Sequence, residues 1–241
     1  MKGIILAGGN ATRLRPLTKI TSKQLLPVYD KPMIFYPIET LVKAGIKDIM
    51  IIIAPTYAGQ FLNLLGSGRE FGAKFTYEIQ EEPRGLSDAF IMGEKFIEDD
   101  SVAMILGDNI FEDDFSEYIK NFESGAIVFA KEVHDPERYG VIEFDENKNV
   151  ISIVEKPKEP KSNYAMVGLY ICDNNVSKIA KAVTPSDRGE IEITGTINEY
   201  LKKEQLKVGI IEGMWEDAGT FDSLLRANNL IAEKAKHKTQ A

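Results

Sequence analysis

The chain has 241 residues, 44% of them hydrophobic, which is enough for one large domain with a buried core. Its net charge of −8 argues against general nucleic-acid binding, which requires a basic face, and its one cysteine, Cys172, excludes a disulfide framework. No stretch approaches the roughly 20 apolar residues of a membrane helix and the start lacks a signal-peptide pattern, so we expect a cytoplasmic protein without membrane or nucleic-acid partners.

The first half alternates short apolar runs with amphipathic stretches. Continuous apolar runs at 4–6, 49–53 and 102–106 predict strands buried on both faces. The apolar spacing predicts one helix over 34–45 and another over 86–97. This alternation is typical of an α/β fold, here a Rossmann-like, doubly wound and mostly parallel sheet.

After about residue 125 the apolar runs alternate partially with polar residues, which favours a mixed β region added over the sheet's C-terminal edge. We read residues 1–241 as a single domain, since no Ser/Gly-rich linker or internal repeat divides the chain. The predicted strands cover 126–133, 140–145, 150–156 and 164–173, with a turn at 145–149, and helices are predicted over 191–203 and 220–236.

The stretch LAGGNATRLRP at 6–16 follows the first predicted strand directly. Glycines at that place let a backbone approach phosphate closely, although many such pairs only form a turn. The spacing matches neither the P-loop nor the G-x-G-x-x-G pattern of dinucleotide-binding oxidoreductases. Residues 1–38 carry six basic side chains and one acid, and this local charge of +5 favours a small anionic ligand over a polymer.

The block KQLLPVYDKPMI at 23–34 follows ten residues after Arg13. With the opening stretch it resembles the sugar nucleotidyltransferases, most closely the glucose-1-phosphate thymidylyltransferases. Further blocks resemble that family in the expected order. These are LGDNIF at 106–111, DPERYGVIEFD at 135–145, EKPKEPKSNYA at 155–165, RGEIEIT at 188–194 and WEDAGT at 215–220.

The resemblance implies transfer of a thymidylyl group from dTTP to α-D-glucose 1-phosphate, giving dTDP-glucose and pyrophosphate. Such a product serves activated-sugar (dTDP-rhamnose type) and surface polysaccharide biosynthesis. The sugar phosphate has a second pKa of about 6, so it is largely ionised at pH 7 and needs no general base. The reaction then requires in-line positioning and neutralisation of negative charge.

The resemblance also assigns residues 1–125 to a nucleotide-binding half. Arg13 and Lys23 would be catalytic, because they would neutralise the charge on the triphosphate. The nucleotide-binding positions are Leu6, Ala7, Gly8, Gly9, Thr12, Arg13, Gln24, Gln80, Pro83, Gly85, Leu86 and Asp108. Gln80 and the turn at 83–86 would read the base, since a glutamine amide pairs with a carbonyl and an N–H of a pyrimidine.

A magnesium ion is implied as well, held by Asp108, which follows the strand at 102–106, and by Asp217. Residues 126–241 would form the sugar-phosphate half. There Glu155 would accept sugar hydroxyls and Lys156 would hold the phosphate. The complete set for this substrate is Asn109, Tyr139, Gly140, Glu155, Lys156, Val167 and Arg188.

The chain departs from the family pattern at several positions. Ala11 replaces a glycine, Ser87-Asp88 replaces Ala-Gln, and Met166-Val167 replaces Val-Thr. The second departure leaves UTP or CTP open as the nucleotide, and another sugar 1-phosphate is open as the acceptor. A catalytically silent regulator that binds sugar nucleotides is a further alternative, disfavoured because Arg13, Lys23, Asp108 and Asp217 are all present.

The resemblance finally implies a homo-oligomer, a dimer or a tetramer. The chain resembles a short form without the C-terminal helical extension that contributes to a second nucleotide site in the long form.

Overall fold

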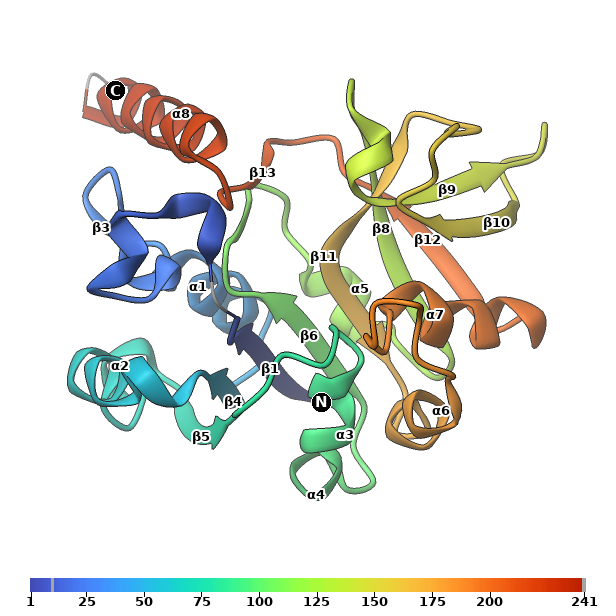
Figure 1. Cartoon of the computed structure of the whole chain (residues 1–241), viewed down its shortest axis with the longest axis horizontal. Coiled ribbons are helices and arrows are strands. Elements are labelled where there is room, and N and C mark those ends of the chain that lie inside the picture. Colours follow the sequence, from blue (N-terminus) through green and yellow to red (C-terminus); the bar gives the residue numbers. More distant parts are fainter. Residues whose placement is uncertain (10, 240–241) are drawn as a thin grey trace.

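The computed structural model describes residues 1–9 and 11–239, the last three without their side chains, and its centre is a sheet of nine strands (Figure 1). Four of them form a parallel region. Its strands at 2–7, 48–53 and 102–106 are apolar and mostly buried, as the continuous runs predict, whereas the fourth, at 74–79, is an edge strand with only Phe75 buried. In spatial order they are β6 (Val102–Leu106), β1 (Lys2–Ala7), β4 (Asp48–Ile53) and β5 (Lys74–Ile79).

The second half of the chain extends the same sheet. Its strands are β8 (Ala126–Glu132), β9 (Gly140–Phe144), β10 (Val150–Glu155), β11 (Tyr164–Cys172) and β12 (Leu206–Ile210). β11 joins the two regions, because it pairs antiparallel with β6 and also with β8 and β9. The expected turn at 145–149 connects β9 to β10, and Asp145 Oδ1 accepts the backbone N–H groups of Asn147 and Asn149.

Helices cover both faces of the sheet. One face packs against α1 (Phe35–Lys43) and α2 (Ala58–Leu65). The other packs against α3 (Asp88–Met92), α6 (Val176–Ala182) and α7 (Ile193–Lys202). Successive strand residues contribute to opposite clusters, Ile4 to one and Ile5 to the other, as the twofold alternation of strand side chains requires. The predicted α/β sheet is therefore confirmed.

Three regions complete the fold. The hairpin of β2 (Pro27–Val28) and β3 (Lys31–Pro32) packs against the long helix α8 (Phe221–Thr239), which lies beside it in Figure 1. A two-stranded sheet pairs β7 (Asn109–Phe111) with β13 (Trp215–Asp217). The remaining short helices are α4 (Glu94–Ile97) and α5 (Ser116–Lys120).

One expected helix is divided. The sequence predicts a single helix over 86–97, but α3 ends at Met92 and α4 begins at Glu94. The break falls at Gly93, where a Cβ atom would lie 2.7 Å from Ile4 Cδ1 of the central strand. The predictions for 34–45, 191–203 and 220–236 are confirmed by α1, α7 and α8.

The order of the strands fixes where a ligand can bind. The chain passes from β1 to β4 and β5 on one side, and then returns to place β6 on the other side of β1. The carboxyl ends of β1 and β6 therefore flank a topological switch point, where open α/β sheets bind their ligands. In the described part of the chain, no helix is long and apolar enough to cross a bilayer.

Candidate active site

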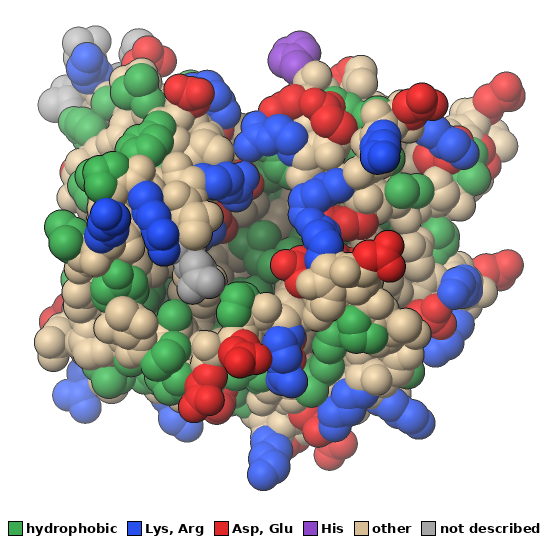
Figure 2. Space-filling view, viewed as in Figure 1, with side chains coloured by type: hydrophobic (Ala, Val, Ile, Leu, Met, Phe, Trp, Pro, Cys, Tyr) green, Lys and Arg blue, Asp and Glu red, His purple; other side chains and the backbone are tan. Residues whose placement is uncertain are grey.

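A cavity of about 330 Å³ opens at this switch point. Figure 2 shows the molecule hollowed between its two halves, with Lys and Arg side chains on both margins. Residues from both halves line it: one wall follows β1 and β6, the opposite wall comes from β9 and β10, and β13 adds Trp215 and Asp217 next to the residues that follow β6. Predicted residues in the lining are Leu6, Gly8, Gly9, Arg13, Lys23, Gln24, Gln80, Pro83, Gly85, Leu86, Asp108, Asn109, Tyr139, Gly140, Glu155, Lys156 and Asp217.

Four predicted residues lie outside this lining. Ala7 and Val167 are almost fully buried in the core, because strand alternation turns their side chains to the face covered by α1 and α2. Thr12 is exposed at the start of a 3₁₀ turn over 12–14. Arg188 does not line the cavity, but its Nη2 lies 2.7 Å from Oε1 of Glu192, which does.

The glycine loop after β1 combines a close contact at Gly8 with a left-handed backbone at Gly9 and Ala11. A Cβ atom at Gly8 would lie 2.5 Å from Gln80 Oε1, so the Gln80 side chain as placed occupies the space that a larger residue at position 8 would need. Gly9 and Ala11 both have positive φ, 97° and 42°. The backbone at Ala11 is left-handed, a conformation that a glycine adopts without strain, and the Thr18 hydroxyl donates a 2.8 Å hydrogen bond to the Ala11 carbonyl.

Two carboxylates and one cation surround Gly219, and a second cation contacts one of the carboxylates. A Cβ atom at Gly219 would lie 2.8 Å from Asp217 Oδ1, 3.1 Å from Arg13 Nη2 and 3.5 Å from Asp108 Oδ2. Lys23 Nζ donates to Asp108 Oδ2. The pairing of β13 with β7 brings Asp217 opposite Asn109, the residue after Asp108, although the two aspartates are far apart in the sequence.

The two carboxylates have opposite pKa shifts. Burial raises the pKa of Asp217 to about 6, and the negative charge of Asp108 adds to the rise against the opposing charges of Lys23 and Arg13. Burial also acts on Asp108, but the charge and hydrogen bond of Lys23 hold its pKa below the ordinary value. The pocket therefore keeps one carboxylate ionised and makes the second costly to ionise without a further positive charge.

The turn at 83–86 connects the two halves. The Ile191 N–H donates to the Arg84 carbonyl at 2.7 Å, and the Ser87 N–H donates to the Ile191 carbonyl at 3.1 Å. Gly85 has a φ of 100°, and a Cβ atom there would lie 2.5 Å from the Ile191 carbonyl oxygen. The Ser87 hydroxyl is 2.7 Å from that of Thr196, so Ser87, one of the departures from the family pattern, ties this turn to α7.

The opposite wall holds charges that are paired with one another. Glu155 Oε1 and Lys156 Nζ are 2.9 Å apart, and Arg188 Nη2 is 3.9 Å from the same oxygen. Gly140 makes room for this wall, since a Cβ atom there would lie 2.9 Å from Thr194. The cations and acceptors that the sequence assigns to a sugar phosphate are therefore side by side.

Asn109 is held from two sides. Its Oδ1 accepts the Trp215 indole N–H at 2.7 Å and the Gly168 backbone N–H at 3.2 Å, so its Nδ2 is directed at Asp108 Oδ1, 3.3 Å away. The Trp215 ring packs edge-on against the Tyr139 ring, with 5.4 Å between the ring centroids. Trp215 is thus part of the cavity wall.

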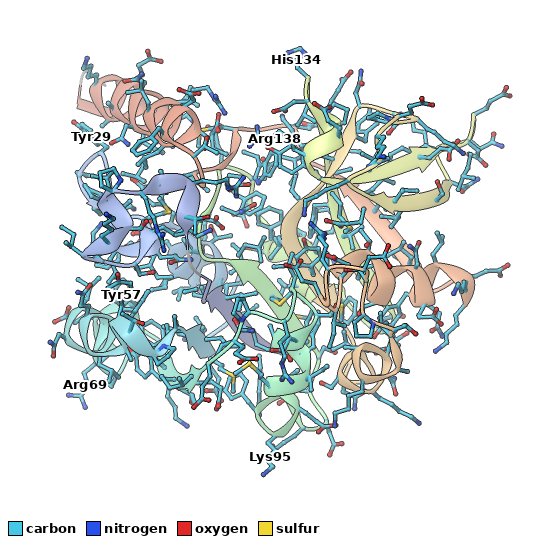
Figure 3. The ribbon with its side chains drawn as sticks, in the orientation of Figure 1. Tyr29, Tyr57, Arg69, Lys95, His134 and Arg138 are labelled. Carbon is cyan, nitrogen blue, oxygen red and sulfur yellow. The ribbon has the colours of Figure 1, made fainter. Side chains whose placement is uncertain are left out.

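Sequence reasoning missed several lining residues. Arg138 reaches from the connection between β8 and β9 toward the hollow (Figure 3), is held by Asp135 and lies 5.4 Å from the Tyr139 ring centroid. Its place beside Tyr139 was the available signal. The other missed residues are Leu106, Met166, Gly168, Tyr170, Glu190, Glu192, Ile193 and Trp215.

Comparisons with known proteins agree with this geometry. The nucleotidyl transferase family model matches residues 2–234. The glucose-1-phosphate thymidylyltransferase of Neisseria gonorrhoeae is 51% identical over 96% of this chain and 82% of its own, and that of Mycolicibacterium smegmatis is 50% identical over the same shares.

Two solved structures share the fold. A crystal structure from Bacillus anthracis, described as a putative glucose-1-phosphate thymidylyltransferase in complex with a sucrose, has a TM-score of 0.91 at 48% identity and covers 95% of this chain and 94% of its own. A UDP-glucose pyrophosphorylase complexed with UDP-glucose has a TM-score of 0.83 at 27% identity, with 97% and 98% covered. The chain belongs to the nucleotidyl transferase family, and within it to the glucose-1-phosphate thymidylyltransferases.

Proposed function

We propose that the chain transfers a thymidylyl group from dTTP to α-D-glucose 1-phosphate in the presence of Mg²⁺. The observation that carries this proposal is the convergence of Arg13, Lys23, Asp108 and Asp217 in one cavity, between the glycine loop and the Glu155–Lys156 pair. Its relatives at about 50% identity bear the name of this activity.

The reaction joins a phosphate oxygen of the sugar phosphate to the α-phosphorus of the nucleotide, and the bond from that phosphorus to pyrophosphate breaks. Lys156 would hold the attacking phosphate on one wall, while the glycine loop would hold the triphosphate on the other. Arg13 and Lys23 would neutralise the charge that develops on the leaving pyrophosphate. The reaction needs no side chain to act as a general base, because the attacking phosphate is already ionised.

The donor set fits a magnesium ion. Asp108 and Asp217 face the same space, and the raised pKa of Asp217 reflects its burial and its repulsion by Asp108, both of which a positive charge there would offset. Within residues 1–9 and 11–236, no group of three or more His, Cys, Asp or Glu side chains is arranged so that it could hold a metal ion by itself. Two carboxylates suffice for Mg²⁺ when phosphate oxygens and water complete the shell. When bound, the ion would polarise the α-phosphate and offset its charge.

We further propose the roles of the two halves and the state of the protein. Residues 1–125 would bind the nucleotide, residues 126–241 the sugar phosphate, and the protein would work in the cytoplasm as a homo-oligomer. Exposed apolar side chains on α8, Phe221 at 46% and Leu225 at 61%, are compatible with a subunit contact. Light scattering coupled to gel filtration measures the oligomeric state directly.

Pyrophosphate release tests the activity. Glucose 1-phosphate and Mg²⁺ are supplied in parallel reactions with dTTP, UTP, CTP, ATP or GTP. Fast release with dTTP and much slower release with the others supports the proposal, whereas faster release with UTP assigns uridylyl transfer instead. The pyrophosphorylase relative at 27% identity makes that second outcome the relevant alternative. Release with none of the five contradicts the proposed activity.

A further inference from the structure

Asp88 is a buried carboxylate that the proposed reaction does not use. It lies at the start of α3, and 1% of its surface is exposed. With Ser87 it forms the Ser87-Asp88 pair that departs from the family pattern. It accepts two hydrogen bonds. Gln80 Nε2 donates to Oδ2 at 3.0 Å, and Arg84 Nη2 donates to Oδ1 at 2.9 Å. Arg84 is 59% exposed, so it supplies charge from the surface and does not fill the cavity.

The contact with Asp88 fixes which way the Gln80 amide points. A carboxylate only accepts hydrogen bonds, so the amide nitrogen must face Asp88 and the amide oxygen must face the other way. That oxygen is the atom that would lie 2.5 Å from a Cβ atom at Gly8. Turning the amide over would place Oε1 against the Asp88 carboxylate in a buried setting, where two facing acceptors are costly.

Gln80 therefore presents a fixed order of groups to the cavity that it lines. Its oxygen lies on the Gly8 side and its remaining N–H on the Asp88 side. Thymine and uracil offer an N3–H donor beside an O4 acceptor, which matches this order. Cytosine offers an N3 acceptor beside an N4 amino donor, which opposes it at both positions. An amide free to turn over could match either base.

We propose that Asp88 is a specificity-determining positioning residue that locks the Gln80 amide and thereby excludes cytosine nucleotides. This inference rests on the proposed function for its assay, because it assigns the base read at the nucleotide site. Asp88, which stands where the family pattern has glutamine, would then serve in this chain to orient the Gln80 amide.

The sharpest test compares dTTP with 5-methyl-dCTP, since these differ only on the pairing edge of the base. The kcat/KM ratio of the two is measured by pyrophosphate release in the wild type, in Asp88→Asn and in Arg84→Gln. The asparagine amide of the first variant can accept from Nε2 or donate to Oε1, so the lock is lost at nearly constant volume. We expect the ratio to fall about tenfold or more in Asp88→Asn, because two hydrogen bonds no longer discriminate. In Arg84→Gln, which keeps the contact of Asp88 with Gln80, it should stay close to the wild-type value.

A purely structural role for Asp88 would lower both kcat/KM values together and leave their ratio unchanged, and that result overturns the inference. An equal loss of selectivity in Arg84→Gln also overturns it. The wild type provides a test that does not depend on how the variants fold, since use of 5-methyl-dCTP as readily as dTTP contradicts the lock.

The outcomes also separate this inference from the proposed function. A wild type that prefers UTP to dTTP but rejects both cytosine nucleotides refutes thymidylyl transfer and supports the lock, because uracil and thymine share the same edge. A wild type that uses dTTP while Asp88→Asn keeps the ratio refutes the lock alone. Turnover of no pyrimidine triphosphate overturns both.

Discussion

Arg13 differs from Arg15, two residues away, by its place in the cavity. Arg13 lines the cavity beside Asp108 and Asp217, whereas Arg15 is an exposed residue outside the lining. Both lie in the same basic segment, so charge alone does not separate them. The distinction comes from the 3₁₀ turn over Thr12–Leu14, which directs one arginine toward β13.

We predict that Arg13→Ala lowers kcat/KM about 10²–10³-fold, the loss typical of removing one group that stabilises transition-state charge. Arg15→Ala, the matched control, should stay within about twofold of the wild type. Steady-state pyrophosphate release measures both, and thermal unfolding of Arg13→Ala should remain within a few degrees because the side chain is exposed. Equal activity of the two variants would remove Arg13 from the mechanism.

We expect Asp217 to destabilise the metal-free protein at high pH while it is needed for metal binding. Its pKa is raised in the folded protein, so the stability it contributes is complete below the unfolded pKa and is lost as pH rises toward 6 and above. In a metal-free sample, Asp217→Asn should therefore be more stable than the wild type by about 1–2 kcal/mol at pH 8. The gain should shrink as pH falls toward 4.

Urea unfolding in a chelating buffer at pH 5 and pH 8 checks this sign. A gain at pH 8 together with a loss of Mg²⁺-dependent turnover agrees with a carboxylate kept for metal binding. A variant less stable than the wild type at pH 8 would contradict it.

At the scale of elements, the turn at 83–86 does two tasks. It lines the cavity through Pro83 and Gly85, and its backbone hydrogen-bonds to Ile191 in the segment before α7. The backbone of Gly85 lies against the backbone of Ile191, and backbone cannot yield as a flexible side chain can.

This packing makes Gly85 and Gly189 a matched pair. Both have positive φ, but a Cβ atom at Gly189 would meet nothing within 4 Å. Gly189→Ala should cost about 1 kcal/mol, the penalty for a left-handed alanine. Gly85→Ala adds the clash, so we expect a loss at least about 1 kcal/mol larger and a higher KM for the nucleotide. Chemical unfolding and steady-state kinetics measure these effects, and equal losses in the two variants would show that the turn is not docked.

Several elements of the site could be predicted because the signal is local. Gly8 and Asp108 follow continuous apolar strands, so their place at one sheet edge follows from the fold class. Arg138 and Glu192 could not be found this way, since their direction depends on how the second half folds over the cavity. The break at Gly93 could not be predicted from the sequence. Gly93 packs against Ile4 of the central strand, and the spacing of apolar residues within a helix gives no information about that contact.

At the scale of the whole molecule, one sheet passes through both halves. β11 pairs with β6 of the first half and with β8 and β9 of the second, so neither half has a complete sheet without the other. The cavity lies between parts that share a backbone hydrogen-bond network, and we therefore expect the halves to unfold together.

We predict one cooperative unfolding transition. Trp215 is the only tryptophan and lies at the cavity wall, so its fluorescence reports on the cleft, while far-UV circular dichroism reports on the whole sheet. The two probes should give the same urea midpoint. Separate transitions would show that the halves unfold independently.

The most direct measurement follows the oxygens of the nucleophile. Glucose 1-phosphate labelled with ¹⁸O at all four phosphate oxygens is incubated with unlabelled dTTP and Mg²⁺. Mass spectrometry then measures the number of ¹⁸O atoms in each product. Attack of the sugar phosphate on the α-phosphorus predicts dTDP-glucose that carries every label, together with unlabelled pyrophosphate. Label in pyrophosphate, or the absence of a nucleotide sugar, would contradict the chemistry assigned to this cavity.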